Sequence, residues 1–147
     1  MEISKTFEGF LIDNNITYNK IEAGIFFSHE QKNFLLLLDS MDVVYYRLTL
    51  PKIEVPERLN KEKLNEILLQ LTSEFKVAKA IDTGVGGIWF SYEQILCGES
   101  VIDYNYVFSR SIKILSEMLD KYSVYVIDFL HQTTEPENID AVDAVGH

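Results

Sequence analysis

The sequence has 147 residues, 47% hydrophobic and 24% charged, which is the size and composition of one globular domain. Thirteen Lys and Arg against 23 Asp and Glu give a formal net charge of −10, so nucleic acid and anionic lipid would repel the chain at long range. The single cysteine, Cys97, excludes an internal disulfide. Without a signal-peptide pattern or a long apolar run, we expect a cytoplasmic protein with neither a membrane nor a nucleic-acid partner.

The first half of the chain predicts one helix followed by three strands. Apolar residues at helical spacing from Ile3 to Leu11 indicate a helix over residues 2–14. Three runs rich in β-branched, aromatic and aliphatic side chains follow, at residues 18–28, 33–39 and 43–53. Short polar links separate these runs, which favours a three-stranded antiparallel meander.

The second half predicts a helix, two strands and a final helix. Asn60 is suited to cap a helix whose apolar residues from Leu64 to Phe75 recur at helical spacing. Residues 77–82 and 88–94 indicate two strands, and Asp103 can cap the last helix. The predicted order is αβββαββα, an α+β two-layer domain with an antiparallel five-stranded sheet. This domain spans residues 1–131, and the acidic residues 132–147 are predicted to form a disordered tail.

No motif in the sequence points clearly to catalysis, a cofactor or a metal. The glycine-rich segment 84–87 precedes the apolar run Ile88–Phe90, so it predicts a hairpin turn and not a phosphate-binding loop. His29, His131 and His147 lack the spacing of metal ligands, and acidic neighbours would raise the pKa of the Cys97 thiol. We therefore expect no cofactor, no metal and no enzymatic activity.

The strands themselves are unusual because apolar residues occupy consecutive positions. In a sheet covered on one side only, apolar and polar residues should alternate. Here both faces carry large apolar side chains, and those of the second face, left in water, would forgo on the order of 10 kcal/mol. Such a patch indicates an interaction site. One of the monomer's own helices, a second subunit or a client protein could cover it. The candidate binding residues are Phe26, Leu35, Leu37, Val43, Tyr45 and Trp89.

The order of elements resembles the type III secretion chaperone-like fold, and within it the YbjN-like family, whose members are described as sensory or regulatory proteins. The likeness covers about residues 2–130. It is carried best by Leu64-x-x-Ile67-Leu68-x-x-Leu71, by Lys79-Ala80-Ile81-Asp82 and Ile88-Trp89-Phe90 on paired strands, and by the long last helix. The resemblance implies a homodimer that binds segments of a partner protein without catalysis.

Three functional hypotheses follow, in decreasing order of support. The first is a non-enzymatic, chaperone-like or regulatory adaptor that acts as a homodimer and takes apolar side chains of a client on its second sheet face. The second is an immunity or antitoxin-like protein that neutralises a basic toxin through its acidic surface. The third is an enzyme that uses Asp82, Glu93 or His29.

Overall fold

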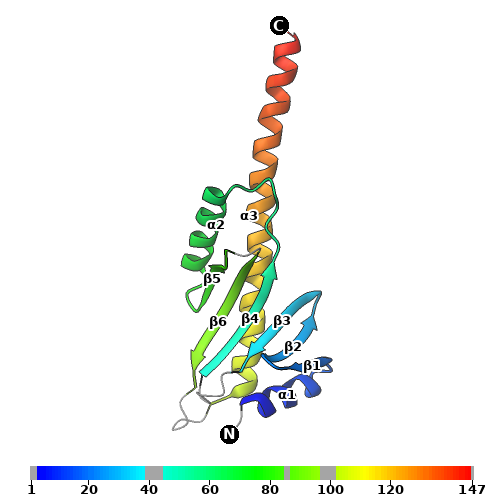
Figure 1. Cartoon of the computed structure of the whole chain (residues 1–147), viewed down its shortest axis with the longest axis vertical. Coiled ribbons are helices and arrows are strands. Elements are labelled where there is room, and N and C mark those ends of the chain that lie inside the picture. The colour runs from blue at the N-terminus through cyan, green and yellow to red at the C-terminus, as the bar shows by residue number, and fades with distance from the viewer. Residues whose placement is uncertain (1–2, 39–44, 85–86, 97–101, 147) are drawn as a thin grey trace.

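The computed structural model describes residues 3–38, 45–84, 87–96 and 102–146, with side chains as far as residue 132. Its sheet has six antiparallel strands in the order β1-β2-β3-β4-β6-β5 (Figure 1). The elements in chain order are α1 (Ile3–Asp13), β1 (Tyr18–Ile21), β2 (Gly24–His29), β3 (Lys32–Leu37), β4 (Tyr45–Ile53), α2 (Lys61–Glu74), β5 (Ala78–Asp82), β6 (Ile88–Ile95) and α3 (Tyr104–Gly146).

The α+β class is as predicted, but the five-stranded sheet and its element order were wrong. The run 18–28, expected to be one strand, is the hairpin of β1 and β2. Gly24 begins β2 against β3, where a Cβ atom would lie 1.8 Å from the carbonyl oxygen of Leu36. Only glycine allows this close approach of the two backbones, so the chain turns here and forms an additional strand.

The three helices lie on one side of the sheet. Helix α3 passes behind β4 and β6 in Figure 1, α2 packs against β5 and α3, and α1 packs against α3. Between the two layers is an aromatic core that includes Phe7, Tyr46, Phe90 and Phe108, all fully buried. The rings of Phe7 and Phe108 meet edge to face with their centroids 4.8 Å apart, an arrangement that adds to the burial energy.

Both helix caps predicted from the sequence are present. The Asn60 side-chain oxygen accepts a hydrogen bond of 2.7 Å from the Lys63 backbone N–H, and Asp103 Oδ1 accepts one of 3.1 Å from Tyr106. Each carboxyl or amide oxygen satisfies a backbone donor that the first turn of a helix leaves free. The helices therefore begin where the capping residues place them.

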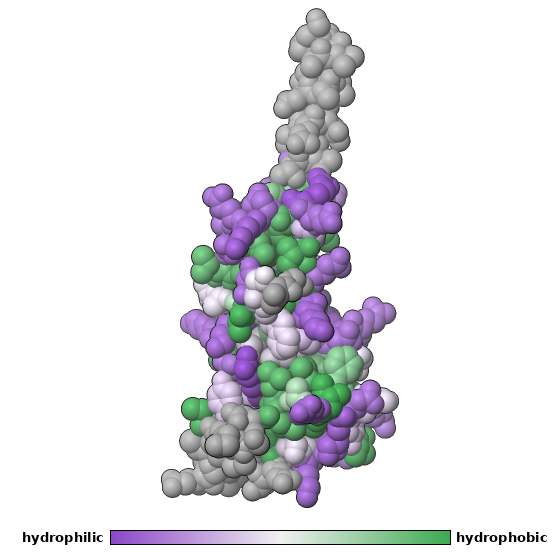
Figure 2. All heavy atoms as spheres, viewed as in Figure 1, coloured by the Kyte–Doolittle hydropathy of each residue, from purple (hydrophilic) through white to green (hydrophobic). Residues whose placement is uncertain are grey.

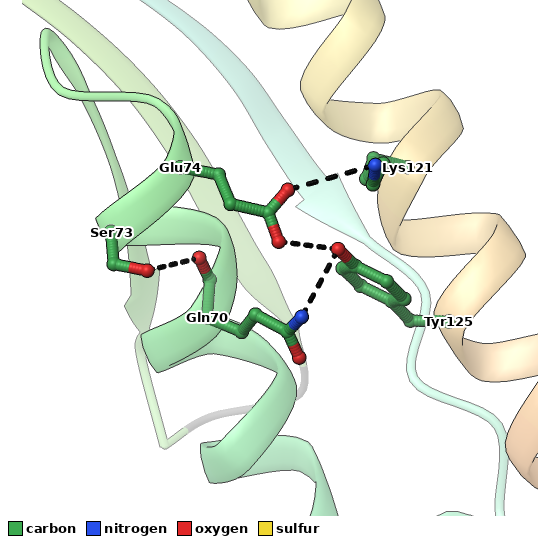
Figure 3. Close-up of polar contacts among 5 residues, drawn as sticks. All are labelled: Gln70, Ser73, Glu74, Lys121 and Tyr125. Atoms are coloured by element: carbon green, nitrogen blue, oxygen red, sulfur yellow. Dashed lines mark hydrogen bonds and ion pairs between the residues drawn. The ribbon is translucent and has the colours of Figure 1, made fainter.

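Polar contacts fasten α2 to α3 on the helix side of the molecule (Figure 3). The Tyr125 hydroxyl donates to Glu74 Oε1 and accepts a 3.2 Å hydrogen bond from Gln70 Nε2. Lys121 Nζ lies 3.7 Å from the other Glu74 oxygen and 5.6 Å from the Tyr125 ring centroid. This cluster holds α2 beside α3, away from the opposite face of the sheet.

Helix α3 continues past the sheet to Gly146 (Figure 1). The disorder predicted for the acidic residues 132–147 stays a prediction. Among the described residues, we find no helix with both the length and the apolar character needed to cross a membrane.

Candidate functional site

One face of the sheet points away from all three helices, and we call it the open face. Helix α2 does not cover it, because the buried side chains of α2 (Leu64, Ile67, Leu68 and Leu71) belong to the core cluster that contains Ile88 and Phe90. The alternative in which the second helix crosses the sheet was therefore wrong. In the part of the chain that the structure describes, no helix lies over the open face. Its main row of paired residues runs from strand to strand as Asn19, Phe26, Leu35, Thr49, Ser91 and Lys79.

Five of the six candidate binding residues lie on the open face. Phe26 and Leu35 are direct cross-strand partners, and Leu37 is one row away on β3. Tyr45 and Trp89 lie on β4 and β6 with the same orientation, whereas Val43 is outside the described residues. Figure 2 shows apolar side chains gathered over β2 and β3 on this side. Their role in binding stays a prediction.

The described candidate binding residues pack against one another on the open face and not against the helix-side core. Leu35 is only 8% exposed, yet it does not belong to the helix-side core cluster. Its cross-strand partners are Phe26 on one side and Thr49 on the other. Phe26, Leu37, Tyr45 and Trp89 are half-buried. The apolar side chains thus shield one another in part and leave the remainder of their surface for a further contact.

A charged cluster, missed in the sequence, occupies the half of the open face formed by β4, β6 and β5. Glu93 on β6 lies 2.6 Å from Lys79 Nζ on β5 and 3.1 Å from Arg47 Nε on β4. The three residues come from neighbouring strands of the sheet, and Arg47 on β4 is distant in sequence from the other two. The signal available was a charged residue within each strand, but β4 and β5 each hold a second one, Lys52 and Asp82, and strand order was needed to bring the three together.

Electrostatics keep the Glu93 carboxylate ionised. Partial burial would raise its pKa, but hydrogen bonds from Lys79 and Tyr45, with the charges of Lys79 and Arg47, outweigh that effect and lower the pKa below its usual value. Desolvation and the hydrogen bond to Glu93 raise the pKa of Tyr45. In the paired rows of the open face, Arg47 and Lys79 outnumber Glu93 by one positive charge, although the chain carries −10.

The hydroxyl side chains of Thr49 and Ser91 lie beneath the larger side chains of the open face. Thr49 Oγ1 donates a 2.9 Å hydrogen bond to the Leu35 carbonyl oxygen. Ser91 is 1% exposed, and its Oγ has no hydrogen-bond partner among the described residues. Arg47 Nε is similarly enclosed and meets Glu93 as an ion pair without hydrogen-bond alignment. These polar atoms are therefore enclosed by the larger side chains around them.

The residues suggested for an enzyme do not meet in one cleft. Asp82 pairs with Ile88 at one end of β6, five positions from Glu93, and its Oδ1 accepts a hydrogen bond from the Gly84 backbone. His29 lies at the end of β2, on the other half of the sheet. The described residues contain no group of three or more His, Cys, Asp or Glu able to hold a metal ion. Residues 85, 86 and 97 lie outside the described part.

Comparison with known proteins supports the fold. Neither a family model nor a curated protein matches the sequence. Among solved structures, this α+β domain with one helix-covered sheet face is similar to YbjN from E. coli, a suggested transcription regulator. The superposition has a TM-score of 0.57 at 14% sequence identity and covers 87% of this chain and 92% of YbjN. The chain therefore has a YbjN-like fold.

Proposed function

We propose that this protein is a non-enzymatic protein-binding module, of the chaperone-like or regulatory-adaptor kind, and that it acts as a homodimer. The observation that supports the proposal is the open face, on which Phe26, Leu37, Tyr45 and Trp89 keep part of their apolar surface in water. A regulatory role is also what is suggested for YbjN, whose fold is similar. The chaperone-like role rests on the family resemblance of the sequence.

The charge distribution favours contact through the open face. Two molecules that each carry −10 repel each other, and a close approach of acidic surfaces adds to this cost. In its paired rows, the open face instead has one excess positive charge, from Arg47 and Lys79 against Glu93. A second subunit or an apolar segment of a client can therefore pack there without gathering carboxylates.

The size of the open face limits the area that self-association can bury. Six strands about 4.8 Å apart, each about six residues long, offer a sheet of about 24 Å by 20 Å. Two such faces in contact would bury about 1,000 Å², which is at the lower end for specific interfaces. Because this small area is opposed by the repulsion between two acidic subunits, we expect weak self-association, with a dissociation constant in the micromolar range.

Sedimentation velocity over about 1–200 µM protein tests the proposal against this affinity. The test variant is Leu37→Asp, in which the new carboxylate faces Arg47, its cross-strand partner, so the monomer can accommodate the change. The control is Leu69→Asp on α2, where the leucine is 72% exposed and lies on the helix side. We expect wild type and the control to dimerise alike and Leu37→Asp to dissociate at least tenfold more readily.

A strict monomer that also binds no other protein through this face would overturn the proposal. Salt distinguishes it from the antitoxin-like alternative. Added NaCl should leave an apolar contact intact and should ease the repulsion between two acidic subunits. An acidic surface that neutralises a basic toxin would instead lose affinity steeply as salt rises.

A further inference from the structure

A second candidate site lies on the helix side, away from the open face. It is a cleft of about 420 Å³ between the end of α1, the turn from β2 to β3, and the middle of α3. Phe10 and Ile112, both buried, form an apolar base, and charged side chains surround it. This volume is in the range of small-molecule sites, which combine an apolar lining with a few polar groups.

Two of the charges around the cleft already pair with each other. Lys32 Nζ lies 3.2 Å from Asp120 Oδ1, which joins the β2–β3 turn to α3. His29 Nε2 lies 3.8 Å from Glu30 Oε1, a contact that is an ion pair only with a protonated imidazole. Lys113 and Glu117 differ, because neither has an ion-pair or hydrogen-bond partner within the described residues. They are four positions apart on α3, so their side chains leave the same face of the helix.

We propose that this cleft binds a free amino acid with an apolar side chain. In such a complex the Lys113 ammonium binds the carboxylate of the amino acid, and the Glu117 carboxylate binds its ammonium. The apolar side chain lies against Phe10 and Ile112. A ligand with a single charge would satisfy only one of the two free groups, whereas a zwitterion satisfies both through charge-assisted hydrogen bonds.

The probes that test this site are L-leucine and L-phenylalanine, added to the full-length protein. Titration calorimetry and the amide chemical shifts of residues around Ile112 report on binding. Leucinamide, which lacks the carboxylate, and N-acetylleucine, which lacks the ammonium, are the matched probes. We expect each to bind about tenfold more weakly than leucine, because each loses one charge-assisted contact.

Single variants assign each contact. Lys113→Gln should bind leucine and leucinamide equally, and Glu117→Gln should bind leucine and N-acetylleucine equally. Lys61→Gln and Glu62→Gln make the same changes at exposed positions of α2, outside the cleft, and should behave as wild type. If neither L-leucine nor L-phenylalanine binds at about 10 mM, the proposal is overturned, because a dissociation constant above that concentration is too weak for a specific site. Equal binding of all four probes by wild type would overturn it too.

Discussion

The two faces of the sheet are similar in sequence and different in their surroundings. Trp89 and Phe90 are consecutive residues of β6, yet Phe90 is fully buried under the helices and Trp89 is half-buried on the open face. The alternation of side chains along a strand explains why they point in opposite directions. It does not say what covers each face, which depends on the paths of α2 and α3. An apolar strand residue is therefore evidence for a contact, but the partner in that contact is set by the rest of the fold.

Alanine substitutions at these two adjacent positions should separate the faces most clearly. Phe90→Ala removes a fully buried ring and leaves a cavity, so we expect a loss of about 3–5 kcal/mol in the free energy of unfolding. Trp89→Ala should cost about 1 kcal/mol in the monomer, because part of its ring is already in water. Urea unfolding followed by circular dichroism, at protein concentrations below dimer formation, measures both. Equal losses would contradict the difference between the faces.

Two tyrosines allow the same comparison at alkaline pH. Burial, with a smaller effect of the Glu54 charge, raises the pKa of Tyr122 on the helix side to about 12. The unfolded state loses this proton near pH 10 and the folded state keeps it, so the stabilisation is complete below pH 10 and is lost towards pH 12. For Tyr122 alone this loss amounts to about 1 kcal/mol by pH 11.

Tyr122→Phe should therefore lose stability less steeply than wild type between about pH 9.5 and 11.5. At neutral pH the variant should be less stable by about 1 kcal/mol, because it loses the 3.0 Å hydrogen bond to the Glu54 carbonyl oxygen. Tyr45→Phe is the matched variant on the open face and should flatten the alkaline limb less. Urea midpoints at each pH give both slopes, and a steeper limb for Tyr122→Phe than for Tyr45→Phe would contradict this ranking.

The sequence was sufficient to predict which strand residues share a face, because that depends on a period of two and on local hairpins. Phe26, Leu35, Leu37, Tyr45 and Trp89 could thus be grouped before the fold was known. The two helix caps were equally local, since Asn60 and Asp103 bind backbone N–H groups three residues away.

Two features could not be predicted because they depend on residues distant in the sequence. Gly24 is the first residue of β2 after the turn, and the need for a glycine there appears only when β3 brings Leu36 beside it. The cluster of Arg47, Lys79 and Glu93 requires β6 to lie between β4 and β5. If the strands lay in the sheet in chain order, β4-β5-β6, the strands of Arg47 and Lys79 would have no common neighbour, and Glu93 could not lie between them.

Within the open face, the hydroxyl of Ser91 should be unfavourable for the monomer. The Oγ atom is buried without a hydrogen-bond partner among the described residues, so Ser91→Ala removes a desolvated polar group at little cost in volume. We expect a gain of about 1 kcal/mol in unfolding free energy. Thr49→Val, its cross-strand neighbour, loses the hydrogen bond to the Leu35 carbonyl oxygen and should not stabilise the protein. Loss of stability in Ser91→Ala would show that its hydroxyl is satisfied.

The smallest effect should come from the charged cluster of the open face. The lowered pKa of Glu93 means that its stabilising effect is present above about pH 4.3, the unfolded value, and is lost as the pH falls through the folded value. Glu93→Gln should therefore cost less than about 1 kcal/mol at pH 7, since such pairs are partly solvated, and less again at pH 3. Glu66→Gln, which removes the exposed ion pair with Lys63 on α2, is the control and should cost less still. Chemical unfolding at pH 3, 5 and 7 gives the differences. A cost for Glu93→Gln that does not change with pH would mean that its carboxylate contributes by packing, and the open face would then owe its order to shape and not to charge.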